Sequence, residues 1–173
     1  MKSSIQNKNR LVNSVFGKVY KKYDLMNDVM SFGVHRIWKS RLIDWMNPQM
    51  NETLIDVASG TGDIAKLFSK RHNHLVKISC VEPNNKMYEI GKMNLEKYKN
   101  IKWFKAKAEK LPFKDNSYNF YTISYGIRNV SDINLSLREA YRVLKPGGRF
   151  ICLEFSKVEN ELLEKIYKIY SKT

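Results

Sequence analysis

Short apolar runs alternate with helical repeats along most of the chain, and this alternation predicts the fold. The apolar runs are rich in β-branched and aromatic residues, which is typical of buried strands. These runs are Leu54–Val57, Val76–Glu82, Ile101–Lys105, Phe120–Tyr125 and Arg149–Phe155. Apolar positions at helical spacing predict helices between and after them. These helices are Ile64–Lys70, Asn85–Tyr98, Leu135–Leu144 and Leu162–Tyr170. Strands that alternate with helices favour an α/β fold built on a doubly wound, mostly parallel sheet.

The N-terminal part differs from the rest of the chain, because its apolar residues have helical spacing and no strand is predicted there. Leu11–Tyr20 and Ile37–Met46 predict helices, and Pro48 closes the second. We therefore expect one structural domain, with a helical segment over residues 1–50 and an α/β core over residues 51–173. Within the core, the Lys-Pro-Gly-Gly sequence that begins at Lys145 stops one helix and turns into the last strand.

The formal net charge of +14 favours anionic partners such as nucleic acid, acidic lipid or an anionic substrate. The basic residues are scattered, however, and form neither a long block of like charges nor an RNA-binding motif. A lysine-rich surface without a dedicated partner and a role at a membrane surface both remain open. No apolar stretch approaches the ~18 residues of a membrane span. Because Met1–Asn9 also lacks the apolar core of a signal peptide, we expect a cytoplasmic protein.

Two cysteines are present, and both lie inside apolar runs. Cys80 falls within Ile78–Val81 and Cys152 within Phe150–Leu153. We expect each to be a buried strand residue rather than half of a disulfide, a metal ligand or a nucleophile. No metal site is predicted.

A turn of small residues follows the first predicted strand. Positions 55–63 read Ile-Asp-Val-Ala-Ser-Gly-Thr-Gly-Asp. Gly60 and Gly62 have no Cβ and tolerate positive φ, so such a turn lets a ligand approach the backbone closely. The spacing Gly60-x-Gly62-x-x-Ala65 also fits the dinucleotide fingerprint. Glu82 lies about 20 residues further on, where a ribose would be held.

Two cofactor classes compete for this turn: a nicotinamide or flavin dinucleotide, and S-adenosylmethionine (SAM). A pyrophosphate needs a helix N-terminus without a neighbouring carboxylate. Asp56 and Asp63 bracket the turn, and two carboxylates suit a ligand that carries a sulfonium and an ammonium group. The local chemistry therefore favours SAM. The alternative is structural, with Asp63 capping the next helix and Asp56 accepting hydrogen bonds from the loop.

In a doubly wound sheet, ligands bind outside the carboxyl ends of the strands, next to the point where the strand order reverses. Four segments should therefore meet. They are the glycine-rich turn, Glu82 after the second strand, Ala106–Glu109 after the third and Ser124–Asn129 after the fourth. The Glu82 carboxylate can accept hydrogen bonds from ribose hydroxyls, and the backbone near Lys107 and Ala108 can frame an adenine. An ordinary surface loop is the alternative for the Lys107 segment.

Five segments resemble, in order and spacing, the UbiE-type ubiquinone/menaquinone biosynthesis C-methyltransferases. They are Tyr23–Trp38, Ala58–Asp63, Ala108–Phe113, Gly126–Val130 and Arg142–Ser156. The glycine turn and the Leu-Lys-Pro-Gly-Gly stretch are shared by many SAM enzymes, whereas Tyr-Asp-Leu-Met-Asn from Tyr23 is specific to this family. The resemblance extends from Val15 to about Tyr170.

This resemblance implies a Rossmann-like, class I SAM-dependent fold and methylation of a ring carbon in a prenylated hydroquinone. The acceptor would be demethylmenaquinol or 2-methoxy-6-polyprenyl-1,4-benzoquinol. The family's SAM contacts fall on Thr61, Glu82, the pair Lys107 and Ala108, and Ser124. Relatives often have a shorter polar residue at the position of Lys107 and an aspartate at that of Glu82.

The reaction needs a group that ionises or polarises the phenol next to the acceptor carbon. Arg128 is the first candidate for this catalytic role. His35, Tyr23 and Asp24 are further candidates, because they fall in the N-terminal segment that would cover the acceptor side. Each has a structural alternative. Arg128 can instead pair with Asp132. His35 can be a helix residue that is hydrogen-bonded to the rest of the structure, and Asp24 can be the N-cap of a helix.

A polyprenyl acceptor stays in the bilayer, so we expect transient contact with a membrane surface, peripheral at its inner face, helped by about 1 kcal/mol for each basic residue near anionic lipid. No nucleic-acid partner is expected, because Ser124-Tyr125-Gly126-Ile127 replaces the Asn/Asp-Pro-Pro-aromatic motif of amino-group methylation. A different small-molecule methyltransferase and a SAM-fold interaction protein without catalysis are the remaining alternatives.

The resemblance also implies that family members continue with two further strands beyond this chain's last predicted helix. We therefore expect a truncated methyltransferase that retains weak SAM binding, has little or no turnover alone and leaves the edge of Arg149–Phe155 unpaired. Such an edge favours a homo-oligomer or pairing with other proteins of the quinone pathway.

Overall fold

Five parallel strands form one sheet, in the order β3-β2-β1-β4-β5. The structure is a computed structural model that describes residues 34–71 and 76–154. The strands are β1 (Thr53–Val57), β2 (Lys77–Val81), β3 (Ile101–Phe104), β4 (Tyr118–Ser124) and β5 (Leu144–Leu153). The order reverses between β1 and β4, as a doubly wound sheet requires. The predicted α/β fold class is confirmed.

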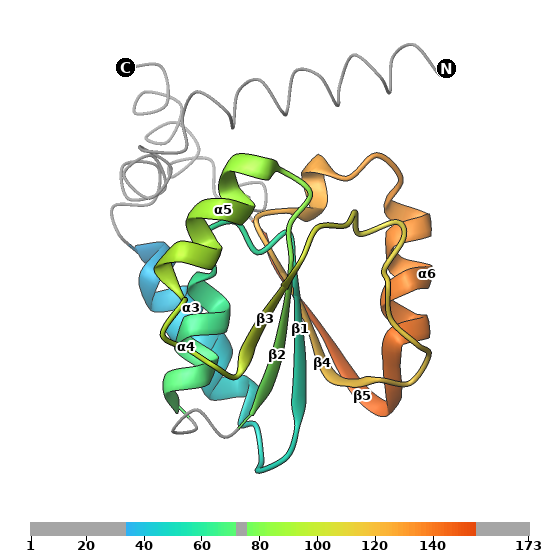
Figure 1. The fold of residues 1–173 in the computed structure, drawn as a ribbon. Coiled ribbons are helices and arrows are strands. Elements are labelled where there is room, and N and C mark those ends of the chain that lie inside the picture. Colours follow the sequence, from blue (N-terminus) through green and yellow to red (C-terminus); the bar gives the residue numbers. More distant parts are fainter. Residues whose placement is uncertain (1–33, 72–75, 155–173) are drawn as a thin grey trace, which may run out of the picture.

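Helices cover both faces of this sheet (Figure 1). The helices are α3 (Val34–Met46), α4 (Asp63–Arg71), α5 (Asn85–Asn94) and α6 (Ile133–Val143), with a short 3-10 helix, η2 (Ile127–Asn129). In Figure 1, α3, α4 and α5 lie on one side of the sheet and α6 lies on the other. Within the described ranges, no helix combines the length and apolar character needed to cross a bilayer.

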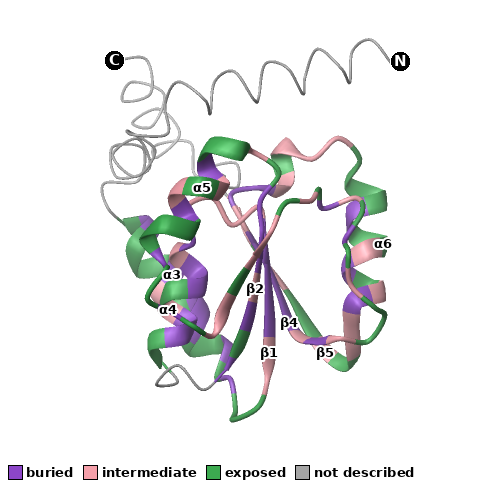
Figure 2. Ribbon diagram, viewed as in Figure 1, coloured by how far each residue is buried: buried purple, intermediate pink, exposed green. Residues whose placement is uncertain are grey.

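Each face of the sheet has its own apolar core, and the central strands are the most deeply buried elements (Figure 2). Under α3 and α4, Phe68 packs edge-on against Phe120, with ring centroids 5.8 Å apart. Under α6, Tyr121 belongs to the second core and stacks on Phe150 at 5.2 Å. Leu42 and other residues of α3 join the first core, so this part of the predicted N-terminal segment packs with the α/β core.

Two element boundaries differ from the prediction by four residues or more. Strand β5 begins at Leu144, directly after α6, whereas the sequence predicts a strand from Arg149. The Lys-Pro-Gly-Gly segment forms an irregularity within β5, since Tyr118 pairs with Leu144 and Phe120 pairs with Arg149. Helix α5 ends at Asn94 rather than Tyr98. The predicted helices Leu11–Tyr20 and Leu162–Tyr170 lie outside the described residues.

Strand β5 lies at one end of the sheet order and, among the described residues, pairs only with β4. Its residues are intermediate or exposed throughout. Cys152 on β5 is exposed, whereas Cys80 on β2 is fully buried. The prediction of a buried Cys152 is therefore wrong, because an apolar run gives a strand but does not tell whether that strand lies at the centre or the end of a sheet.

Candidate functional site

The turn after β1 is tied to the end of β2 by hydrogen bonds. The Ser59 hydroxyl donates to the Asp56 carbonyl at 2.6 Å, and the Val81 amide donates to the Ser59 hydroxyl at 3.1 Å. Ala58 and Gly60 both have positive φ, at 53° and 57°. A left-handed alanine costs roughly 1–2 kcal/mol, so the surrounding hydrogen bonds hold the turn in a strained shape at the carboxyl end of the sheet.

A cavity opens at this end of the sheet, which lies at the top of Figure 1. Loops after β1, β2, β3 and β4 contribute to it, as the strand order predicts. Its lining consists of Val57, Ala58, Gly60, Glu82, Pro83, Asn84, Met87, Lys107, Ala108, Glu109, Ser124, Tyr125, Gly126, Asn129, Val130 and Ser131. Five of the predicted cofactor-binding residues therefore come together, namely Gly60, Glu82, Lys107, Ala108 and Ser124.

Glu82 is held in the cavity wall by the backbone. Its Oε2 accepts from the Gly60 amide at 2.9 Å, and its Oε1 accepts from the Asn84 amide at 2.8 Å. Burial raises the pKa of the Glu82 carboxyl, and the two amide donors oppose that rise. A carboxylate oxygen has a second lone pair, so each oxygen can still accept from a hydroxyl group on a ligand.

Asp56 lies on β1, below the turn, and is only 2% exposed. Its Oδ1 accepts from the Thr122 hydroxyl at 2.8 Å, while Oδ2 is buried without a hydrogen-bond partner among the described residues. Burial raises the pKa of Asp56 to about 7, although Thr122 and the Lys39 charge oppose the rise. Asp56 is therefore a carboxyl group with one satisfied oxygen and one oxygen that lacks a partner.

The two glycines of the turn face different surroundings. A Cβ on Gly60 would touch only the Met87 side chain, at 3.4 Å, and Gly60 lines the cavity. A Cβ on Gly62, where φ is +88°, would lie 2.5 Å from Leu95 Cδ1 and 3.0 Å from the Trp103 ring. The sequence assigns both glycines to ligand approach. In the structure, the Gly62 position is tight because of the core beneath the turn.

The remaining cofactor candidates lie close by. The Ser124 hydroxyl is buried and has no hydrogen-bond partner among the described residues, although it borders the cavity. Thr61 lines a smaller cavity that adjoins the first and shares Gly60 and Ser124 with it. An unsatisfied buried hydroxyl costs about 1–3 kcal/mol, so Ser124 fits a site that takes a polar ligand.

Of the four predicted catalytic residues, the structure describes Arg128 and His35, and neither lines the two cavities. Arg128 lies on η2, next to Asn129 of the cavity wall, and pairs with Glu154 rather than with Asp132. Asp132 instead caps α6 by accepting from the Leu135 amide. His35 is buried on α3, with no place in the lining of the cavity. Tyr23 and Asp24 lie outside the described residues.

The sequence reasoning missed Lys39, which is buried on α3 and pairs with Asp63 at 2.6 Å. A signal for it was present. The buried residues of α3 are His35, Lys39, Leu42, Ile43 and Met46, and this spacing places a lysine on the inner face of an amphipathic helix. Asn84, the N-cap of α5, and Met87, in the first turn of α5, were also missed, and both line the cavity. Within the described ranges, His, Cys, Asp and Glu side chains form no group of three that could hold a metal ion.

Comparison with known proteins places this geometry among methyltransferases. The profile of the ubiE/COQ5 methyltransferase family matches residues 3–173. A protein of Rickettsia bellii, named ubiquinone/menaquinone biosynthesis C-methyltransferase UbiE, is 51% identical over 170 residues, which cover 95% of this chain and 68% of the relative. A protein of the same name from Brucella abortus is 47% identical, with 95% of this chain and 63% of the relative covered.

Solved structures agree on the fold. A SAM-dependent methyltransferase from Thermotoga maritima superposes with a TM-score of 0.65 at 27% identity and covers 92% of this chain and 69% of its own. A SAM-dependent methyltransferase from Aquifex aeolicus gives a TM-score of 0.64 at 22% identity, with 71% and 66% covered. The Rossmann-like class I methyltransferase fold is thereby confirmed.

Proposed function

Because the chain belongs to the ubiE/COQ5 methyltransferase family, we propose that it methylates a ring carbon of a prenylated hydroquinone, with SAM as the methyl donor. Family and fold together identify a SAM-dependent methyltransferase. The observation that carries the choice of acceptor is the 47–51% identity to relatives named for C-methylation in quinone biosynthesis. The proposed acceptors are demethylmenaquinol and 2-methoxy-6-polyprenyl-1,4-benzoquinol.

The residues of the cavity suit the adenosine part of SAM. Glu82 presents two carboxylate oxygens whose orientation is fixed by backbone amides, which suits a ribose diol. Lys107 and Ala108 lie on the adjoining wall, where their backbone can frame an adenine. Gly60 has no side chain, so the part of the cavity next to it stays open. A Cβ at this position would lie against the Met87 side chain, which also lines the cavity. The fit rests on hydrogen-bond acceptors and on space, not on a positively charged cradle for a pyrophosphate.

Bound SAM supplies a methyl group that is already activated by the sulfonium. The protein has two remaining tasks: to hold the acceptor carbon in line with that methyl group, and to make the carbon nucleophilic. As the ring carbon took the methyl group, the carbon–sulfur bond of SAM would break, and the proton of that ring carbon would pass to solvent. A cation near the neighbouring phenol oxygen stabilises the phenolate. We assign this role to Arg128, which pairs with Glu154 and directly precedes Asn129 of the cavity wall. His35, Tyr23 and Asp24 remain second candidates.

Calorimetry with SAM, followed by methyl transfer to a short-chain demethylmenaquinol, tests the proposal. We expect saturable SAM binding and transfer of the methyl group to carbon. Arg128→Ala should keep SAM affinity within about two-fold and lower turnover by roughly 100-fold or more, while Arg138→Ala on the exposed side of α6 should change neither. SAM binding without methylation of any quinol would favour a binding protein. Absence of SAM binding would overturn the assignment.

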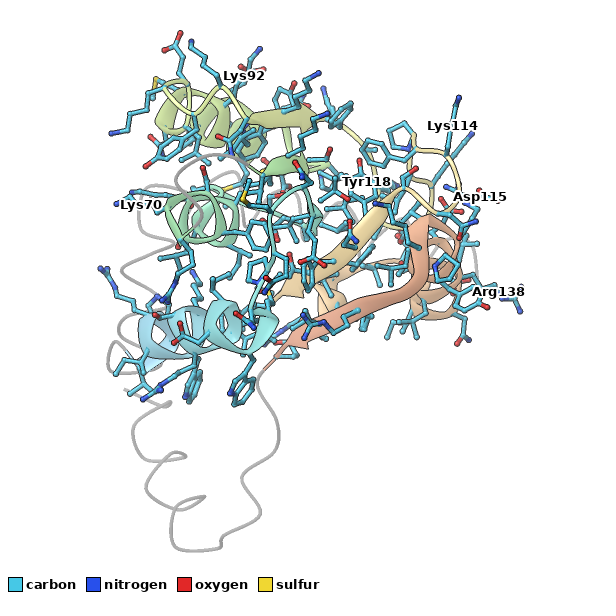
Figure 3. The ribbon with its side chains drawn as sticks, turned by 90° about the horizontal axis from the view of Figure 1, so that it is seen from below. Lys70, Lys92, Lys114, Asp115, Tyr118 and Arg138 are labelled. Carbon is cyan, nitrogen blue, oxygen red and sulfur yellow. The ribbon has the colours of Figure 1, made fainter. Side chains whose placement is uncertain are left out.

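We also propose that the outer face of α3 meets the membrane that holds the acceptor. Trp45 on α3 is 80% exposed, Ile37 is exposed on the same helix, and Met50 is exposed just beyond its end. Arg41 is exposed on the same helix. Tryptophan and aliphatic side chains beside arginine are typical of surfaces that lie at a lipid interface. Basic side chains such as Lys70, Lys92, Lys114 and Arg138 project from several sides of the molecule (Figure 3), so net charge alone does not select this face.

Co-sedimentation with vesicles tests this contact. We expect more protein on vesicles with anionic lipid than on neutral vesicles, and a clear loss for Trp45→Ser. Tyr141→Ser is the matched control, because Tyr141 is 85% exposed on α6, which covers the opposite face of the sheet. Equal binding to both kinds of vesicle, or an equal loss in both variants, would contradict a lipid-facing α3.

A further inference from the structure

A groove lies between α3 and α4, apart from the two cavities at the carboxyl end of the sheet. It is lined by Ser40 and Ile43 of α3 and by Leu67, Lys70 and Arg71 of α4, and none of these residues lines either cavity. Ile43 is buried and Leu67 is partly buried, whereas Lys70 and Arg71 are exposed. The groove therefore has an apolar floor and a rim that carries a hydroxyl group and two positive charges.

Two ion pairs connect the helices on either side of this groove. Lys39 Nζ of α3 donates to Asp63 Oδ2 of α4 at 2.6 Å. Asp44, near the other end of α3, pairs with Arg71 at the end of α4. The other groove residues lie between these pairs along both helices. Because the pairs hold α3 and α4 together, the groove is formed before a ligand arrives.

Both cations on the rim are available to a ligand. Lys70 makes no ion pair within residues 34–71 and 76–154. The side chains of Arg71 and Asp44 are 50% and 38% exposed, and an ion pair this open to water adds little to stability. Arg71 can therefore turn from Asp44 to a ligand at little cost, and a guanidinium binds a phosphate through two parallel hydrogen bonds.

The apolar floor and the basic rim together select the class of ligand. A simple inorganic anion would meet the rim but would gain nothing from Ile43 and Leu67. A zwitterionic lipid would bring a cationic group next to Lys70 and Arg71. In an anionic phospholipid, the phosphate can pair with both cations while the glycerol and the first acyl carbons cover the floor.

We propose that the groove between α3 and α4 binds the headgroup of an anionic phospholipid. Lys70 and Arg71 pair with the phosphate, and the Ser40 hydroxyl donates a hydrogen bond to it. The inference rests on the membrane contact proposed above and adds a site that recognises the charge of the lipid. Ile37 and Trp45 are exposed on α3, so the apolar membrane contact and the groove share one helix, which favours a lipid over an acidic protein.

Co-sedimentation with vesicles that contain phosphatidylglycerol, compared with pure phosphatidylcholine vesicles, tests the site. We expect Lys70→Gln to lower the affinity for the anionic vesicles about ten-fold or more and to leave binding to neutral vesicles within about two-fold. Ser40→Phe fills the groove without a change of charge and should cause a similar loss. Lys66→Gln is the matched control, because it removes an exposed charge from the same helix outside the groove, and its loss should stay within about two-fold.

A short-chain phosphatidylglycerol, used below its micelle concentration, tests the groove without a membrane. Calorimetry should show saturable binding that is lost in Lys70→Gln and in Ser40→Phe. Glycerol phosphate should bind more weakly than this lipid, because it leaves Ile43 and Leu67 uncovered. Equal affinity for glycerol phosphate and for the lipid would overturn the lipid assignment. Tighter binding of a poly-glutamate peptide than of the lipid would overturn it in favour of an acidic protein.

The outcomes separate the groove from the membrane contact. Equal losses in Lys70→Gln and Lys66→Gln, or unchanged binding by Ser40→Phe, would leave only a diffuse effect of charge and would overturn the groove. A loss of vesicle binding confined to Trp45→Ser would remove the groove and keep the contact through α3. If the parent binds the short-chain lipid but neither kind of vesicle, the membrane contact fails and the groove stands.

Discussion

The two ends of the site hold a buried carboxyl group in opposite ways. At one end, both oxygens of Glu82 accept from backbone amides, so its orientation is set before a ligand arrives. At the other end, Asp56 has one oxygen bonded to Thr122 and one buried oxygen without a partner in the described structure. Burial raises the pKa of both groups. Backbone amides therefore satisfy both oxygens at the Glu82 end, whereas at the Asp56 end a ligand is needed to satisfy the second oxygen.

The largest effect should come from the turn that joins these two ends. Gly62→Val places a side chain against Leu95 and Trp103 at a φ of +88°. Overpacking of up to about 3 kcal/mol and left-handed strain of up to about 2 kcal/mol should together lower the free energy of unfolding by up to about 5 kcal/mol, as measured by urea denaturation. Gly60→Ala is the comparison, because its Cβ meets only Met87 at 3.4 Å. Equal losses in the free energy of unfolding for the two variants would show that Leu95 and Trp103 do not restrict the side chain at position 62.

Asp56→Asn should change how the free energy of unfolding depends on pH. The folded pKa of Asp56 is about 7 against 3.8 for the ordinary group, so between these values the unfolded chain is ionised while the folded protein keeps its proton. The parent therefore loses stability as pH rises from about 4 to 7, by up to about 1.4 kcal/mol per pH unit. The asparagine variant lacks this loss and should gain on the parent across that window. A pH-independent difference in the free energy of unfolding would contradict the raised pKa.

Glu82→Gln should have a smaller effect, and on binding more than on stability. The amide keeps the shape of the side chain but replaces one acceptor oxygen with an NH₂ group that faces a backbone amide. We expect SAM to bind more weakly by roughly 1–3 kcal/mol, as measured by calorimetry. Glu89→Gln on the exposed side of α5 is the matched control. If both variants bind SAM as the parent does, the Glu82 end is not the ribose side of the site.

Much of the Glu82 end could be predicted from sequence, because it depends on where strands stop. Glu82 and Ala108 follow strands and Ser124 ends one, and parallel strands bring their carboxyl ends to one edge of the sheet. The same rule and the strand order place the site between β1 and β4 without any knowledge of side-chain contacts. The family resemblance names these residues, and the topology explains why they lie together.

The Asp56 end could be predicted only in part. Asp56 and Asp63 were found, but the pairing of Asp63 with Lys39 joins residues 24 positions apart on two helices, and no local pattern encodes it. A side chain at position 62 would meet Trp103 of β3. The sequence of the turn gives no sign of this contact, because Trp103 lies on a different strand. The exposure of Cys152 likewise depends on the place of β5 in the sheet. Each miss concerns a contact between distant segments.

Trp103 links three parts of the chain in one further way. Its ring occupies the space where side chains on Gly62 and on Gly91 of α5 would lie. A larger residue at Gly91 needs a smaller residue at position 103, whereas a larger residue at Gly62 needs space from both Trp103 and Leu95. The turn, the helix and the strand are therefore coupled through one ring, and substitutions at Gly91 and Trp103 should be non-additive in their effect on the free energy of unfolding.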